Sequence, residues 1–154
     1  MNPCLAQKFV LMLKPQLKDN GDFAGNVYLD TAGWNSLTVL MAMGETDVAA
    51  GDAVGSTAEG TAPLLEECDT VGGIYTAVTG AALGTPMQFD DDGKLFAFDV
   101  DLRKTHKRYM RVQAPHSAAG AANGSNLCII GILSNPQQAP ESAAQRGLEE
   151  AVSA

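Results

Sequence analysis

The side chains in this sequence most able to do chemistry are two histidines, three cysteines and a run of three aspartates. His106 and His116 have no aspartate or cysteine at a spacing typical of a metal-ligand pair or a catalytic triad. Triads assemble from distant positions, so spatial proximity to such groups stays open. Because no nucleophile, base and stabilising group can be named together, we expect surface histidines and no enzymatic activity. A hydrolytic or metal enzyme is the alternative reading.

The cysteines do not form a recognisable metal-binding pattern. Cys4, Cys68 and Cys128 are widely spaced, and no Cys-x-x-Cys or Cys/His pair occurs. A zinc site is therefore not expected. Cys128 lies inside the apolar run Leu127–Leu133, so we expect it to be a small core residue.

The aspartates at 90–92 precede Gly93 but differ from a calcium-binding loop. Consecutive acids on an extended chain point to alternate sides, and no closing glutamate follows at the required spacing. We expect a solvated turn. The glycines likewise lack the spacing of a phosphate-binding or dinucleotide-binding loop. The sequence thus predicts no metal, no cofactor and no small-molecule substrate.

The charge balance argues against nucleic acid as a partner. A net charge of −8 repels phosphates, whose neutralisation drives most nucleic-acid binding. Five of the ten basic residues nevertheless fall within nine positions: Arg103, Lys104, Lys107, Arg108 and Arg111. On so acidic a chain, we expect this basic stretch to meet an acidic protein surface. A solvated strand face without a partner is the alternative.

The apolar run Phe9–Leu13 is too short for a secretory core or a membrane span. No other stretch approaches those lengths, so the sequence predicts a soluble protein made in a cytoplasm, with no membrane partner. Its 154 residues suffice for one domain with a single core.

Alternating apolar residues and turn signals predict an all-β fold, a β-sandwich or jelly roll. Leu37–Met43 is apolar on both faces, which suggests a strand sandwiched between two layers. Pro15 is expected to end the first strand. The expected strands are Lys8–Lys14, Val27–Asp30, Leu37–Met43, Leu64–Glu67, Ile74–Thr79, Met87–Phe89, Leu95–Leu102, Lys107–Ala114 and Leu127–Leu133.

Asp92-Gly93 predicts a hairpin that joins Met87–Phe89 to Leu95–Leu102, because Asp-Gly supplies the positive φ angles of tight turns. In the second of these strands, alternation places Phe98 inward and Asp99 outward. Residues 44–63 form a long loop with room for one weak strand. The tail from Gln137 to Ala154 supports at most a marginal helix.

Several segments resemble a family of small cement, or decoration, proteins of tailed-phage capsids. The segments are Gly44–Asp47, Glu66–Asp69, Gly73–Gly80, Phe98–Arg103, Lys107–Val112, Ile129–Leu133 and Asn135-Pro136. The resemblance spans most of residues 8–136. The chain departs from the family pattern at Cys68, where a serine is expected, and in a longer intervening loop.

The resemblance implies a jelly-roll-like β-sandwich at residues 8–136, with an N-terminal arm (1–7) and a C-terminal arm (137–154). It implies a dimer or trimer that binds the outer surface of the virion and clamps neighbouring major capsid subunits. Linking several weak contacts would give the avidity. The family has no catalytic residues to carry over.

We expect the partner contacts to come from both arms, the 44–63 loop and the basic stretch, although chain ends are often disordered. The candidate residues are Arg103, Lys104, Lys107, Arg108, Arg111, Pro136, Pro140, Arg146 and Leu148. The alternative function is a carbohydrate-binding or receptor-binding β-sandwich on a virion surface, which would use the aromatic rings of Trp34, Tyr28 and Tyr75.

Overall fold

The computed structural model describes residues 6–23, 28–55, 62–113, 115–138 and 144–149. These residues form strands and short 3₁₀ segments, with no α-helix in the described ranges, so the expected all-β fold is confirmed. The elements are β1 (Gln7–Lys18), β2 (Gly21–Asp22), β3 (Leu29–Asp30), β4 (Trp34–Thr46), β5 (Asp52–Gly55), β6 (Leu64–Cys68), β7 (Thr76–Ala82), β8 (Met87–Gln88), β9 (Leu95–Asp101), β10 (Tyr109–Val112), β11 (His116–Ser117), β12 (Ser125–Pro136) and η2 (Ala144–Arg146).

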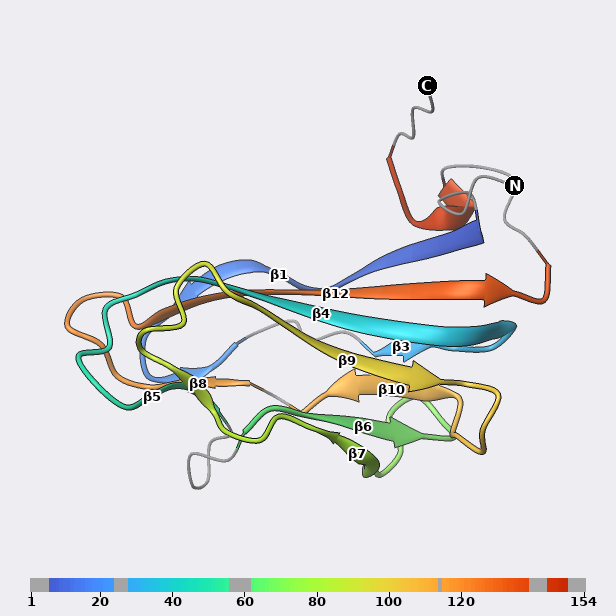
Figure 1. Cartoon of the computed structure of the whole chain (residues 1–154), viewed down its shortest axis with the longest axis horizontal. Coiled ribbons are helices and arrows are strands. Elements are labelled where there is room, and N and C mark those ends of the chain that lie inside the picture. The colour runs from blue at the N-terminus through green and yellow to red at the C-terminus, as the bar shows by residue number, and fades with distance from the viewer. Residues whose placement is uncertain (1–5, 24–27, 56–61, 114, 139–143, 150–154) are drawn as a thin grey trace.

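The strands form three four-stranded antiparallel sheets arranged as a β-sandwich. The long sheet β1-β12-β4-β9 makes one layer. The two shorter sheets, β2-β11-β5-β8 and β3-β10-β6-β7, lie side by side in the other layer (Figure 1). The two short sheets have matching strand orders. Equivalent positions are held by strands that follow each other along the chain: β2 and β3, β11 and β10, β5 and β6, and β8 and β7.

The core fills the space between the two layers. From the long sheet, β4 contributes Leu37, Val39 and Met41, each fully buried, at every second position. Leu65 of β6 and Met110 of β10 meet them from the other layer and are equally buried. Full burial of one such side chain stabilises the fold by about 1.5–3 kcal/mol.

The expectation that β4 is covered by a layer on each face is wrong for the described residues. Leu40 and Ala42 alternate with the core residues, point away from the short sheets and stay half-buried. Among the described elements, η2 alone lies on that side, next to β1 (Figure 1). Cys128 also lies on this outward face, so the prediction that it is a core residue is wrong. Its neighbours Leu127 and Ile129 take the inward positions.

Pro15 does not end the first strand. β1 continues to Lys18, and its pairing with β12 shifts register between Leu11 and Leu13 and again between Leu13 and Gln16. These irregularities place Pro15 in a bulge at the edge of the sheet, where its missing N–H breaks no regular ladder bond.

The predicted hairpin between β8 and β9 is wrong. The turn itself exists: Gly93 has a φ of 74°, and Lys94 N–H donates to the Asp91 carbonyl. The flanking strands, however, belong to different layers, since β8 pairs with β5 and β9 pairs with β4. The turn therefore carries the chain from one layer to the other.

The predicted faces of β9 are confirmed, with Phe98 buried and Asp99 exposed. In the 44–63 region, β4 continues to Thr46 and β5 supplies one short strand. Residues 56–61 of that loop lie outside the described residues, as do Val27 and Ala114 at the ends of two predicted strands.

Candidate functional site

The basic stretch lies between β9 and the end of β10, and much of its charge is balanced within the chain. Arg103 pairs with Asp101 at 2.8 Å, Arg108 with Asp30 at 2.7 Å, and Arg111 with Glu66 at 2.9 Å. Lys107 Nζ donates to Thr76 Oγ1, whereas the exposed Lys104 forms no ion pair within the described ranges. The stretch is therefore not a continuous positive patch.

Two of these arginines join an aromatic cluster on the outward side of the β3-β10-β6-β7 sheet. Arg108 lies 5.1 Å from the centre of the Tyr109 ring, and Arg111 lies 4.1 Å from that of Tyr75. The rings of Tyr28 and Tyr109 meet edge to face at 6.1 Å. We call Tyr28, Tyr75, Tyr109, Arg108 and Arg111 the Tyr–Arg surface. It gathers all three tyrosines of the chain.

The arginines of the Tyr–Arg surface are held rigidly. Arg108 donates two hydrogen bonds to the Asp30 carboxylate, from Nε at 2.9 Å and from a terminal nitrogen at 2.7 Å. This pairing lowers the pKa of Asp30, so the carboxylate stays ionised. Fixed tyrosine and arginine side chains are enriched among residues that dominate the binding energy of protein interfaces, because little freedom remains to be lost.

Exposed apolar side chains lie beside the Tyr–Arg surface. Tyr75 follows Ile74, which is 88% exposed, and Val71 in the same β6–β7 connection is 47% exposed. Tyr28 itself is 43% exposed. The sequence could indicate only Tyr109 and Arg111 as neighbours on one strand face. Pairing of β10 with β3 and β6, and of β6 with β7, adds Tyr28 and Tyr75 from distant segments.

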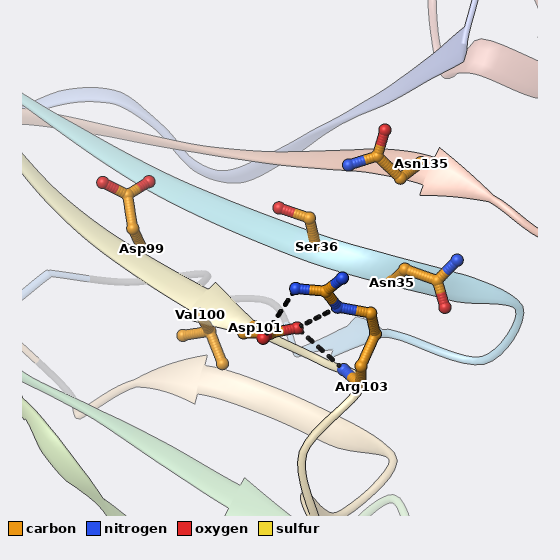
Figure 2. Close-up of a pocket in the computed structure, with 7 residues that line it drawn as sticks. All are labelled: Asn35, Ser36, Asp99, Val100, Asp101, Arg103 and Asn135. Atoms are coloured by element: carbon orange, nitrogen blue, oxygen red, sulfur yellow. Dashed lines mark hydrogen bonds and ion pairs between the residues drawn. The ribbon is translucent and has the colours of Figure 1, made fainter.

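A second candidate site is a polar hollow of about 450 Å³ at the ends of β4, β9 and β12. Figure 2 shows its lining: Asn35, Ser36, Asp99, Val100, Asp101, Arg103 and Asn135. Arg103 clamps Asp101 from its side chain and from its backbone N–H. Asp99 accepts a hydrogen bond of 2.6 Å from Thr38 Oγ1.

The chemistry available in this hollow is limited. The clamp by Arg103 lowers the pKa of Asp101 to about 2, so this carboxyl does not donate a proton near neutral pH. A general acid would need a raised pKa, and no serine, cysteine or lysine in the lining is hydrogen-bonded to a base. The hollow can accept hydrogen bonds but assembles no catalytic set.

Each histidine lies beside a carboxylate, a feature that sequence spacing did not reveal. His106 Nδ1 is 3.0 Å from Glu67 Oε2, and His116 Nδ1 is 3.1 Å from Asp22 Oδ1. Both histidines, expected at the surface, are half-buried, with side chains 18% exposed at His106 and 25% exposed at His116. In the described part of the chain, no hydrogen-bonded nucleophile completes either pair, and no three His, Cys, Asp or Glu side chains gather as metal ligands.

The C-terminal candidates occupy the other side of the sandwich. Pro136 ends β12 opposite Trp34 of β4. Arg146 is buried, and Leu148 is half-buried beside it. The next residue after Arg146, Gly147, lies against the β1 backbone at Phe9, so η2 is docked on β1. Pro140 lies outside the described residues.

The rings proposed for sugar stacking are partly occupied. Arg111 covers one face of Tyr75, and Trp34 packs against the core. A hollow of about 430 Å³ at Trp34 is lined by Ala32, Gly33, Gln137 and Gln138. The Tyr–Arg surface therefore presents edges and guanidinium groups more than open ring faces.

No protein-family model matches this chain, and no curated protein matches it either. In the ranges that the structure describes, no helix has the length and apolar character needed to cross a membrane.

Proposed function

We propose that this protein is a capsid cement protein, which binds the outer surface of a tailed-phage shell and clamps neighbouring major capsid subunits. The observation that carries the proposal is the strand order. We treat β2/β3, β5/β6, β7/β8 and β10/β11 each as one interrupted strand. The chain then has eight strands, which we letter B to I from β1 to β12. The long sheet has the order B-I-D-G, and the layer of the two short sheets has the order C-H-E-F. This order supports a jelly roll, the fold implied by the resemblance to phage cement proteins.

The resembling segments support the proposal by their roles. The Asp and Arg of Phe98–Arg103 form the Asp101–Arg103 clamp at the end of β9. The last arginine of Lys107–Arg111 pairs with Glu66, which belongs to another resembling segment. The first pair fixes the chain where it leaves β9 and the second links β10 to β6, structural roles that suit a protein whose function is mechanical.

The proposed clamp uses several modest contacts. The Tyr–Arg surface with Ile74 supplies one, and the two arms supply others. Gln7 at the start of β1 pairs with Ser134 near the end of β12, so both arms would leave the sandwich at one place. Binding the assembled lattice but not free subunits stabilises the shell by mass action. Joining such contacts raises avidity by about 10²–10⁴.

Mass spectrometry of purified virions tests the function. We expect a copy number that is a simple fraction of that of the major capsid protein, on the outer surface of the shell. Absence from virions, or a copy number unrelated to the lattice, would rule the function out. A glycan-array signal would instead favour the carbohydrate-binding alternative.

Two variants test the contacts, by co-sedimentation with shells that lack the protein. Deletion of residues 137–154 should weaken attachment while the protein stays folded. The double variant Tyr28→Ser/Ile74→Ser should lower affinity at least about tenfold, since exposed anchors are lost. Leu17→Ser is the matched control, because Leu17 is 53% exposed on β1, away from the Tyr–Arg surface. Unchanged attachment of both variants would contradict the contact assignment.

A further inference from the structure

The outward face of the long sheet carries a continuous apolar block. The pairing of β1, β12, β4 and β9 aligns Leu11, Ile130, Leu40 and Ala97 in one row across all four strands. The row on one side contains Phe9 and Ile132, and the row on the other contains Cys128, Ala42 and Leu95. We call these nine residues the outer-face block.

The outer-face block is open to solvent in a single chain. Leu95 is 63% exposed and Leu11 is 53% exposed. The members on β4 and β12 are half-buried by their neighbours in the same sheet. Of the described elements, η2 alone lies on this side, at the start of β1 (Figure 1). Contiguous apolar surface of this kind marks an interaction site in soluble proteins.

The distribution of polar groups matches that of a protein interface. None of the nine residues is charged, although the chain carries a net charge of −8. The row of Phe9 and Ile132 ends in the polar pair Thr38–Asp99, and the next row on that side contains Ser134 and Ser36. An apolar centre with a polar rim is the usual anatomy of an interface.

The charge distribution favours a second copy of this chain as the occupant. Two acidic molecules repel each other over most of their surfaces, and an uncharged block is where that repulsion is weakest. A twofold contact places the same patch on both subunits, so the patch must be self-compatible, as an uncharged apolar sheet face is.

The size of the face fits such a contact. Four strands at ~4.8 Å spacing and three rows ~6.8 Å apart give the outer-face block roughly 400 Å² per copy, and one polar row at each end brings the face to about 600 Å². Two copies would bury about 1,200 Å², at the lower end of the range for specific interfaces. Two sheets packed face to face at ~10 Å form the same kind of contact as the interior of a sandwich.

We infer that two copies pair through their outer-face blocks as a twofold dimer, with the long sheets face to face. The dimer leaves the Tyr–Arg surface on the outside of each subunit, free for another partner. The inference rests on the proposed function and adds self-association to it. Its test uses free protein, so the inference and capsid binding can fail separately.

The experiment measures mass and thiol protection together over a range of protein concentrations. Light scattering after size exclusion should give twice the 16.0 kDa chain mass at high concentration. Cys128 lies within the block, and Cys68 is buried, so a Cys4→Ser background makes Cys128 the reporter thiol. Its maleimide modification should slow at least about tenfold as the dimer forms.

Lysine substitutions identify the face. Ile130→Lys and Leu95→Lys should each raise the dimer dissociation constant at least about tenfold, because a charge is then buried against its own copy. Leu95 is already mostly exposed, so its variant keeps the monomer folded, as circular dichroism checks. Ile74→Lys is the matched control on the opposite layer and should leave the dimer intact.

Three results would overturn the inference. One is a monomer at all concentrations, and a second is a trimer, which a twofold face cannot build. The third is a dimer in which Cys128 keeps its monomer reactivity and Leu95→Lys has no effect. If the free protein is monomeric but Leu95→Lys abolishes capsid attachment, the outer-face block contacts the shell and not a second copy.

Discussion

The Arg111 guanidinium lies 4.1 Å from the centre of the Tyr75 ring, while its Nε donates to Glu66. The Tyr75 hydroxyl is buried and has no hydrogen-bond partner within the described residues, and burial raises its pKa. Tyr75→Phe keeps the stack and removes the unsatisfied hydroxyl. We expect its free energy of unfolding to lie within about 0.5 kcal/mol of wild type or above it.

Tyr75→Leu is the contrasting variant, because it removes the ring. Loss of the cation–π contact should cost about 0.5–1 kcal/mol in urea unfolding. A Tyr75→Phe variant destabilised as much as Tyr75→Leu would show that the hydroxyl, and not the stack, matters.

Gly131 lies at the centre of β12 and faces the core. A Cβ there would collide with the side chains of Leu29 and Met12, both essentially without exposure. Gly131→Ala should therefore destabilise the protein by about 1–3 kcal/mol in denaturant unfolding. Gly84→Ala is the control, since a Cβ at Gly84 meets nothing within 4 Å. Equal effects of the two variants would contradict the packing described for this layer.

Asp101 makes the stability of the fold depend on pH in the acid range. Arg103 holds the pKa of folded Asp101 at about 2, below the ordinary value of 3.8. A lowered folded pKa gives a contribution that is present above pH 3.8 and is lost as the pH falls towards 2. The melting temperature should fall as the pH is lowered from 3.8 to 2, and Asp101→Asn should make the melting temperature less dependent on pH in this range. Because the pair is exposed, high salt should also weaken it. An unchanged profile in the variant would exclude Asp101 as a contributor.

Gly147 tests how the C-terminal segment docks on β1. It has a φ of 72°, and a Cβ there would collide with the Phe9 carbonyl. Gly147→Ala should release residues 144–149, seen as faster amide exchange or proteolysis there, with the core melting temperature nearly unchanged. Under the proposed function, capsid occupancy should also fall.

Gly51→Ala is its matched control. Gly51 has a similar φ of 83°, but a Cβ there meets nothing within 4 Å. Both variants therefore share the strain of a positive φ, and the difference between them reports the collision with β1. If Gly51→Ala released the C-terminal segment equally, docking at Phe9 would not be its cause.

Local patterns predicted the strands of this protein well. The alternation in Leu95–Asp101 identified Phe98 as inward and Asp99 as outward, because a half-buried strand imposes a period of two on its own residues. Asp92-Gly93 likewise identified a turn, because the positive φ of Gly93 is a preference of the residue itself. Which strands pair depends on distant partners, so the same turn could not reveal that β8 and β9 separate into two layers.

The Tyr–Arg surface depends on pairing between distant strands, so it could not be predicted from the sequence. The sequence placed Arg108 and Arg111 in a basic stretch, but their carboxylate partners Asp30 and Glu66 lie 78 and 45 residues away. Asp47 offers another example. Its carboxylate accepts backbone hydrogen bonds from Ala122 and Asn123, which the spacing along the chain could not indicate.

The position of β12 governs how the chain can fold as it is made. This last strand lies between β1 and β4, with Gln7 opposite Ser134, so β1 has no sheet neighbour until Ser125–Pro136 has left the ribosome. Pairings of such high contact order form slowly, on the order of milliseconds to seconds, and leave the nascent chain with open edges meanwhile. A nonsense codon near the start of β12 would therefore leave β1 without its sheet partner and β4 paired with β9 alone, and should prevent the native fold.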